Sequence, residues 1–280
     1  MVDAAQRRAL AFDAALVLAV PKLLAAVHFL VPPDFQQTLA FGHASFRVYT
    51  LFTSAYVADS SLLLYGNLVG YGVSLAAAYA LCVETGERRW FRYTFVLDLL
   101  VLPVLVNLTS YAVRSPSATP VEHGFSAVVA GFGGLLLVAL VAFVARRHGS
   151  ALAAAVGLSL VFCLVQLVDL RYAGSVRPPV TGLVALGVGL TFVPYVRGGV
   201  DLPASGDRRD AVVTAVAVAL AGVVLAALLL GLFPRTVALA SGETATDAFA
   251  HAAGLLWGAV VALTTWVVAR GRGHAPSQVE

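Results

Sequence analysis

The sequence predicts an all-α membrane protein, a polytopic bundle of eight transmembrane helices, from three observations. Hydrophobic residues make up 60% of the 280 residues and charged residues only 12%, and the mean hydropathy is +0.88. A water-soluble domain cannot bury that much apolar surface. Eight apolar runs are long enough to cross a hydrocarbon core about 30 Å thick, and arginines cluster between them. Residues 1–280 are therefore expected to form a single membrane domain.

The eight apolar runs follow one another, mostly with short connections. Each has about 20 residues, which is the length that an α-helix needs to cross a bilayer. The first run contains Asp13, Pro21 and Lys22, and it is too long for the apolar segment of a cleavable signal peptide. The predicted spans lie near residues 10–31, 61–83, 93–113, 124–145, 150–170, 179–196, 211–233 and 248–269.

The basic residues predict how the spans are oriented. Cytoplasmic loops of membrane proteins carry an excess of Lys and Arg. With the N-terminus in the cytoplasm, twelve arginines fall on the inner side and five on the outer side, and Lys22 lies within the first span. Removing any one span would reverse all later loops and destroy this separation, so both termini are predicted to be cytoplasmic. The inner arginines are Arg7, Arg8, Arg88, Arg89, Arg92, Arg146, Arg147, Arg197, Arg208, Arg209, Arg270 and Arg272, and the outer ones are Arg47, Arg114, Arg171, Arg177 and Arg235.

Two connections and the C-terminal segment differ from the short loops. Residues 32–60 form an outer connection rich in aromatic residues, a composition typical of a segment in the membrane interface. Residues 197–210 are expected to form a solvated cytoplasmic turn, and residues 270–280 a disordered cytoplasmic tail.

The charges and the cysteines argue against several kinds of ligand. The net charge of +3 comes from short arginine clusters between apolar runs, which is not a nucleic-acid-binding pattern. Cys82 and Cys163 lie inside apolar runs without metal-ligand or CxxC spacing, and we interpret both as core residues. We therefore expect no metal, no cofactor and no nucleic-acid partner.

Three polar residues are expected at one depth in the membrane. Ser126 and His251 each lie in the first turn of a span that enters from outside, and Asn67 lies about 9 Å below the outer end of its span. Polar residues inside spans are costly and are therefore functional candidates. A serine, a histidine and an asparagine can serve a hydrolase as nucleophile, general base and oxyanion donor. The first backbone N–H groups of the Ser126 helix can also hold an oxyanion.

Each of these residues also has a simpler interpretation. A serine on a membrane helix usually serves packing, and an intramembrane histidine can carry protons in a transporter. An asparagine can form a hydrogen bond between helices. The shared depth of the three residues favours a hydrolase, but by itself it leaves the other interpretations open.

The sequences around these residues resemble one known family. The stretch "GFSAVVAG" (124–131) is similar to the Gly-x-Ser motif of rhomboid intramembrane serine proteases. The stretch "HAAGLLWG" (251–258) is similar to their His-x-x-Gly-x-x-x-Gly motif, and residues 46–72 resemble their first loop and second helix. The resemblance covers about 46–145 and 235–270 and points to a prokaryotic, archaeal type with a rhomboid-like core and two extra helices.

The resemblance implies roles for individual residues. Ser126 would be the nucleophile and His251 the general base. Asn67 and Gly124 would form or support the oxyanion site, and Arg47 would be a structural residue of the first loop. The implied enzyme is an intramembrane serine endopeptidase of a prokaryotic cell membrane. Its implied partners are the lipid bilayer and transmembrane-helix substrates, which it would cut near the outer face.

Two features depart from the family pattern. The family often has a histidine four residues before the asparagine, where this chain has Leu63, so one oxyanion donor would be missing. The family's six-helix core has one helix between the serine helix and the histidine helix, whereas this chain has three predicted helices there. An inserted pair keeps the histidine helix entering from outside, and the sequence leaves open which two helices are extra. The outer loop 234–247 would take the place of the family's mobile cap.

Small residues predict close packing of the helices that carry Ser126 and His251. Ridges of small residues spaced four apart let membrane helices approach closely. We therefore expect the two side chains to meet at about 2.6–3.2 Å, with the extra helix pair displaced to the periphery. The packing residues are Gly254 and Gly258 on the eighth span, and Ala127, Ala130, Gly131 and Gly134 on the fourth.

Two other functions are alternatives. An inactive rhomboid-like scaffold would keep the fold and bind client helices, but loss of Ser126 or His251 would have favoured it and both are present. A transporter would use polar residues inside the spans. Those near span ends can instead extend to the interface, as expected for Asp13, Asp98 and Asp169. The polar residues that a transporter would use are Asp13, Lys22, Asp98, Gln166 and Asp169.

Overall fold

Long helices occupy all eight predicted apolar runs. The computed structural model describes residues 4–43, 45–113, 121–197, 208–232 and 248–272. Within these residues the helix boundaries agree with the predicted runs to within a few residues. The long helices are α1 (Ala4–Leu30), α4 (Ser61–Glu84), α5 (Arg88–Val113), α6 (Ser126–His148), α7 (Ser150–Ala173), α8 (Pro178–Arg197), α9 (Arg208–Leu232) and α10 (Ala248–Arg272).

Seven of these helices are long and apolar enough to cross a membrane. The exception is α8, whose apolar part, Pro178–Pro194, is shorter. The architecture is therefore that of an all-α membrane bundle with at least seven candidate spans among the described residues.

The predicted tail, 270–280, begins inside α10, and its last eight residues lie outside the described residues. Loop 234–247 and most of the turn 197–210 also lie outside the described residues.

The long connection between α1 and α4 folds into short elements rather than an open loop. It contains α2 (Pro33–Leu39), α3 (Thr50–Thr53) and the 3-10 helix η1 (Ser54–Tyr56). Its strand β1 (Phe41–Gly42) pairs antiparallel with β2 (Val121–Glu122), which lies just before α6. The connection is therefore tied to the segment that leads into α6.

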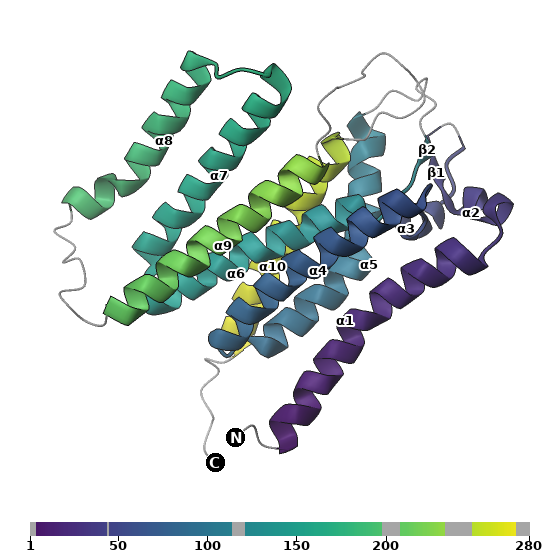
Figure 1. Cartoon of the computed structure of the whole chain (residues 1–280), viewed down its shortest axis with the longest axis horizontal. Coiled ribbons are helices and arrows are strands. Elements are labelled where there is room, and N and C mark those ends of the chain that lie inside the picture. Colours follow the sequence, from purple (N-terminus) through teal and green to yellow (C-terminus); the bar gives the residue numbers. More distant parts are fainter. Residues whose placement is uncertain (1–3, 44, 114–120, 198–207, 233–247, 273–280) are drawn as a thin grey trace.

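The helix α6 is the centre of the bundle. In its most apolar 18-residue stretch, 78% of the residues are buried inside the protein, whereas the corresponding share in the other six candidate spans is 17–39%. It packs against α4, α5, α7, α9 and α10 (Figure 1). Its glycines and alanines allow this, because small side chains let several neighbours approach one helix.

The helices α7 and α8 form a hairpin at one edge of the molecule (Figure 1). Phe162 of α7 lies against Gly187 of α8, where a Cβ would be only 2.6 Å from its ring. The helix α8 packs chiefly against α7, whereas α9 packs directly against α4 and α6. The helix α8 therefore lies at the periphery, whereas α7 packs against α6, α8 and α9.

The acidic residues inside the helices do not extend to the interface as expected. Asp13 is buried and accepts hydrogen bonds from Arg88, Arg92 and Tyr79, which attach α1 to α4 and α5. Asp98 is fully buried in α5, and neither of its carboxylate oxygens has a hydrogen-bond partner among the described residues. The expectation is wrong for these residues because their helix faces turn into the bundle.

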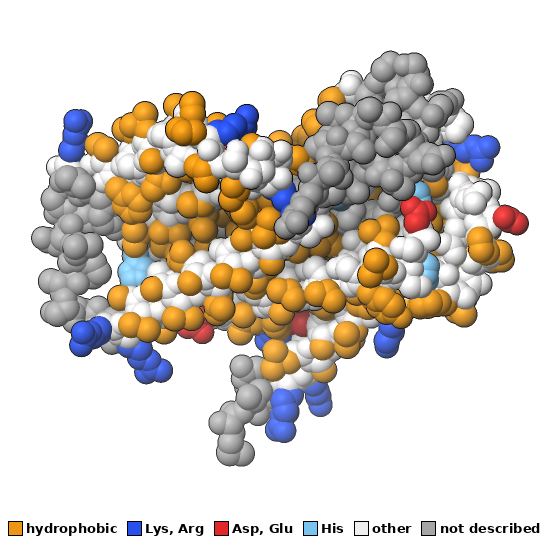
Figure 2. Space-filling view, turned by 45° about the horizontal axis from the view of Figure 1, so that its top comes forward, with side chains coloured by type: hydrophobic (Ala, Val, Ile, Leu, Met, Phe, Trp, Pro, Cys, Tyr) orange, Lys and Arg blue, Asp and Glu red, His pale blue; other side chains and the backbone are white. Residues whose placement is uncertain are grey.

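The outer surface of the bundle is apolar. Figure 2 shows hydrophobic side chains spread widely over the visible helices, as a lipid-facing surface requires. Cys82 is buried as expected, but Cys163 is exposed on α7. The interpretation of Cys163 as a core residue is therefore wrong. It lies on the α7–α8 hairpin, where α7 is covered on fewer sides than the central helices.

Candidate active site

Ser126 is the first residue of α6, and the backbone before it is fixed by contacts with the α1–α4 connection. Gly124 has a φ of +126°, a conformation that side-chain-bearing residues rarely adopt. Its N–H donates to the Ser54 carbonyl at 3.0 Å. Phe125, which follows, is buried against the rings of Tyr56 and Tyr71. These contacts hold Ser126 at a helix N-terminus, where the first N–H groups have no intrahelical acceptor.

The hydroxyl of Ser126 meets the imidazole of His251. The distance from Ser126 Oγ to His251 Nε2 is 2.8 Å, although 125 residues separate the two in sequence. The expected contact between the two side chains is confirmed. With the imidazole proton on Nδ1, Nε2 accepts the Ser126 O–H, which is the arrangement of a nucleophile and its general base. His251 is 4% exposed and Ser126 is half-buried, so the pair lies at the edge of the packed interior.

Backbone contact between α6 and α10 brings these two residues together. A Cβ at Gly254 would collide with the Ala127 carbonyl, and one at Gly258 would collide with the Gly131 carbonyl. A Cβ at Gly134 would in turn collide with the α10 backbone at Leu255 and Ala259. The packing predicted from the small-residue ridges is therefore confirmed. Gly131 also accommodates the Leu102 side chain of α5, which the sequence had not indicated.

Hydrogen bonds between α5 and α10 hold the other side of α10. Trp90 Nε1 donates to the Ala262 carbonyl at 3.1 Å and to Thr265 Oγ1 at 2.9 Å. Nearer to His251, Trp257 Nε1 donates to Thr109 Oγ1 at 2.9 Å. A helix clamped on two sides holds its imidazole in a narrow range of positions, as general-base catalysis requires.

Asn67 lies level with Ser126 on the neighbouring helix α4. Two contacts bracket it: the Leu63 side chain lies 3.9 Å from where a Cβ at Gly124 would be, and Val129 packs on Gly70. The helices α4 and α6 start at the same end of the bundle. Asn67 lies about one turn from both Leu63 and Gly70 on the same face of α4, so it faces the first turn of α6. Asn67 is 4% exposed, and its Nδ2 has no hydrogen-bond partner among the described residues. A buried amide without a partner is costly and is typical of a functional position.

Leu63, one turn before Asn67 on α4, brings an apolar contact to the start of α6. Its Cδ2 lies beside Gly124. This position therefore adjoins the backbone that precedes Ser126, and it supplies no hydrogen-bond donor from its side chain. Among the described residues of α4, Asn67 is therefore the side-chain hydrogen-bond donor that faces the first turn of α6.

The contact of His123 with Asp59 was missed in the sequence. His123 lies three residues before Ser126 and contacts the Asp59 carboxylate in the α1–α4 connection. Tyr56, in the same connection, donates to the Leu99 carbonyl at 2.7 Å, and burial raises the pKa of Tyr56 to about 12. Its hydroxyl therefore stays protonated at neutral pH. The position of His123 in "HGFS", close to Ser126, could have marked it as a candidate residue. Its contact with Asp59 could not be foreseen, because that contact depends on how the α1–α4 connection folds.

The described residues contain no group of three or more His, Cys, Asp or Glu side chains arranged to hold a metal ion. The chemistry of this site is carried by a hydroxyl, an imidazole, an amide and helix N–H groups. This set can attack a carbonyl carbon and hold the oxyanion that forms.

No family model matches this chain, and no curated protein or solved structure is significantly similar to it.

Proposed function

We propose that this chain is an intramembrane serine endopeptidase of the rhomboid type that cleaves transmembrane-helix substrates. Ser126 is the nucleophile, His251 the general base and Asn67 an oxyanion donor. Its site opens near the outer face of a prokaryotic cell membrane, and both termini are cytoplasmic. The observation that carries the proposal is the 2.8 Å contact between Ser126 Oγ and His251 Nε2.

The proposed reaction has two halves, acylation of Ser126 and hydrolysis of the resulting ester, and the same groups act in both. Ser126 Oγ attacks the scissile carbonyl carbon while His251 Nε2 takes the hydroxyl proton. Asn67 Nδ2 and the N–H groups at the start of α6 stabilise the oxyanion of the tetrahedral intermediate. His251 then gives its proton to the leaving amine, which leaves an ester on Ser126. Water, activated by the same imidazole, hydrolyses that ester and restores the enzyme.

The packing of α9 supports a rhomboid-like core despite the two additional helices. The family has one helix between the serine helix and the histidine helix. In this chain α9 packs against α4 and α6, whereas α8 packs chiefly against α7. We assign α9 to the core and α7 and α8 to the extra pair. The core is then α1, α4, α5, α6, α9 and α10.

The polar residues that a transporter would use lie in separate parts of the bundle. Asp13 is paired with Arg88 and Arg92 between α1 and α5. Asp169 is paired with Arg177 in the α7–α8 hairpin. Asp13 and Asp169 are thus each paired with arginines, and the two pairs lie on different helices. An inactive scaffold is separated from the proposal by the reactivity of Ser126.

Labelling with a fluorophosphonate tests the proposal directly, because this reagent forms a stable bond with a base-activated serine. We expect the purified protein to be labelled and Ser126→Ala to lose the label. Ser61→Ala is a matched control, since Ser61 Oγ also lies 3.0 Å from a histidine nitrogen, His28 Nε2, at the start of α4. Labelling that persists in Ser126→Ala, or that disappears in Ser61→Ala instead, would overturn the proposal.

A further inference from the structure

A partly open cavity lies between the end of α7 and the end of α9. It has a volume of about 520 Å³ and lies between the last two turns of α7 and the end of α9. Small-molecule sites have volumes of about 300–1,000 Å³. Its lining residues are Leu167, Leu170, Arg171, Tyr172, Ala173, Gly174 and Leu230.

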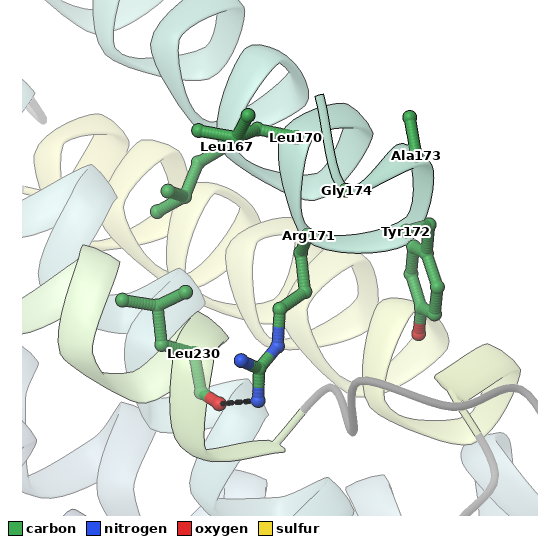
Figure 3. Close-up of a pocket in the computed structure, with 7 residues that line it drawn as sticks. All are labelled: Leu167, Leu170, Arg171, Tyr172, Ala173, Gly174 and Leu230. Atoms are coloured by element: carbon green, nitrogen blue, oxygen red, sulfur yellow. Dashed lines mark hydrogen bonds between the residues drawn. The ribbon is translucent and has the colours of Figure 1, made fainter. Parts of the chain in front are cut away.

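The cavity exists because α7 separates from α9 toward this end. Midway along the two helices, Leu160 packs on Gly222, with its Cδ2 3.5 Å from where a Cβ would be. Near the end, the long side chain of Arg171 bridges from α7 to the Leu230 carbonyl at 3.1 Å. In Figure 3 the Leu167 and Leu230 side chains approach the cavity from the two helices, and Arg171 extends between them. The end of α7 is the same end of the bundle at which α6 begins with Ser126, since α7 runs back from the end of α6.

The lining changes from apolar to cationic along α7, toward the end of that helix. Leu167 lies about 10 Å deeper than Gly174, at a rise of 1.5 Å per residue. Leu170 and Leu230 are each 40% exposed, although they face the cavity. A water molecule needs two to four polar partners to occupy such a space, and the leucine side chains offer none. The deeper part therefore suits a hydrocarbon chain, and the guanidinium at the mouth suits a phosphate group.

We infer that this cavity binds an anionic phospholipid, with the phosphate on Arg171 and one chain against Leu167, Leu170 and Leu230. The lipid fills the space between the α7–α8 hairpin and α9 and links the hairpin to the core. This inference concerns a site away from Ser126 and His251 and does not depend on the proposed protease activity.

Native mass spectrometry of the full chain in detergent tests the inference by titration with phosphatidylglycerol, phosphatidylcholine or inorganic phosphate. We expect one phosphatidylglycerol to bind more tightly than phosphatidylcholine, and inorganic phosphate not to compete. Arg171→Ala should weaken phosphatidylglycerol binding about fivefold, the scale for losing one cation near a lipid headgroup. Arg171→Lys should keep most of the affinity. Arg47→Ala removes another outer arginine, one that bonds Tyr49, and should have no effect.

A second variant tests the apolar part without removing the charge. Leu230→Trp fills the cavity while the Leu230 carbonyl and Arg171 remain, so it should weaken binding of both lipids. Equal losses in Arg171→Ala and Arg47→Ala would indicate nonspecific attraction and overturn the inference. Unchanged lipid binding in both Arg171→Ala and Leu230→Trp would place the lipid elsewhere. Displacement of phosphatidylglycerol by inorganic phosphate would mean that the site takes a free anion instead of a lipid.

Discussion

Ser126 and His251 act on the same proton in the proposed reaction, so their substitutions should not be additive. We expect Ser126→Ala and His251→Ala each to lower the rate of cleavage of a transmembrane substrate at least about 10³-fold. The double variant should be no slower than either single variant. The measurement is single-turnover cleavage in detergent or proteoliposomes, with Ser61→Ala as the control. Losses that multiply in the double variant would show that the two residues work independently, and the dyad would be rejected.

Asn67 should contribute to the transition state more than to substrate binding. Its buried Nδ2 has no partner among the described residues and is available to an oxyanion that forms only during the reaction. We expect Asn67→Ala to lower kcat on the order of 10²-fold, the usual cost of losing one oxyanion donor, with KM little changed. Melting temperature checks that the variant folds. A folded variant with normal kcat would remove Asn67 from the site.

The candidate residues could be predicted because polar residues inside apolar runs are conspicuous. Ser126, His251 and Asn67 each interrupt such a run, and their depth follows from counting along a helix of known rise. The contact of His123 with Asp59 could not be predicted, because it depends on the fold of an irregular connection. Asp98 was misjudged, since its distance from a span end says nothing about which way its helix face turns.

At the scale of helices, close contact between α6 and α10 depends on glycine at Gly258. A methyl group there would collide with the Gly131 backbone, which cannot move aside as a flexible side chain can. We expect Gly258→Ala to lower the free energy of unfolding by about 1–3 kcal/mol, as overpacking does elsewhere. Fluorophosphonate labelling of Ser126 should slow as well, because α10 carries His251. Both effects are measured on the purified protein, by thermal unfolding and by the time course of labelling.

A matched control for this change lies on α4. A Cβ at Gly72 would have no neighbour within 4 Å, so Gly72→Ala adds the same methyl group without a collision. Alanine favours a helix by about 1 kcal/mol over glycine, and the control should be neutral or slightly stabilising. Equal destabilisation in Gly72→Ala and Gly258→Ala would mean that the α6–α10 contact is not the cause of the loss.

The helices themselves could be predicted because bilayer thickness fixes their length. Their neighbours could be predicted only where small residues marked a contact, as Gly254 and Gly258 did for α6 and α10. The position of α7 and α8 could not, because every run has a similar apolar composition and no feature of the sequence separates core from periphery. The hydrogen bonds that Trp90 and Trp257 form between α5 and α10 were also missed, since an indole N–H finds its partner only after packing.

At the scale of the whole molecule, the path of the chain depends on whether α8 crosses the membrane. The arginine distribution predicts eight crossings, with each loop on the side that its charge favours. The helix α8 has the shortest apolar segment, Pro178–Pro194, and it lies at the periphery with α7 as its main neighbour. If α8 lay along the surface, α9 would enter from the wrong side. It would then run parallel to α6, whereas the structure has the two helices antiparallel: His148 at the end of α6 bonds Thr214 near the start of α9, and Gly133 lies against Leu228.

Cysteine accessibility at the ends of α7 and α8 therefore decides the topology. Ser150, Ser175 and Arg208 are exposed, at the start of α7, between α7 and α8, and at the start of α9. In a background without Cys82 and Cys163, we expect Ser175→Cys in intact cells to react with a membrane-impermeant maleimide. Ser150→Cys and Arg208→Cys should react only after the membrane is opened, because eight crossings put both positions in the cytoplasm. Reaction of Arg208→Cys from outside together with Ser175→Cys would show that α8 does not cross, and the eight-span arrangement with both termini in the cytoplasm would be wrong.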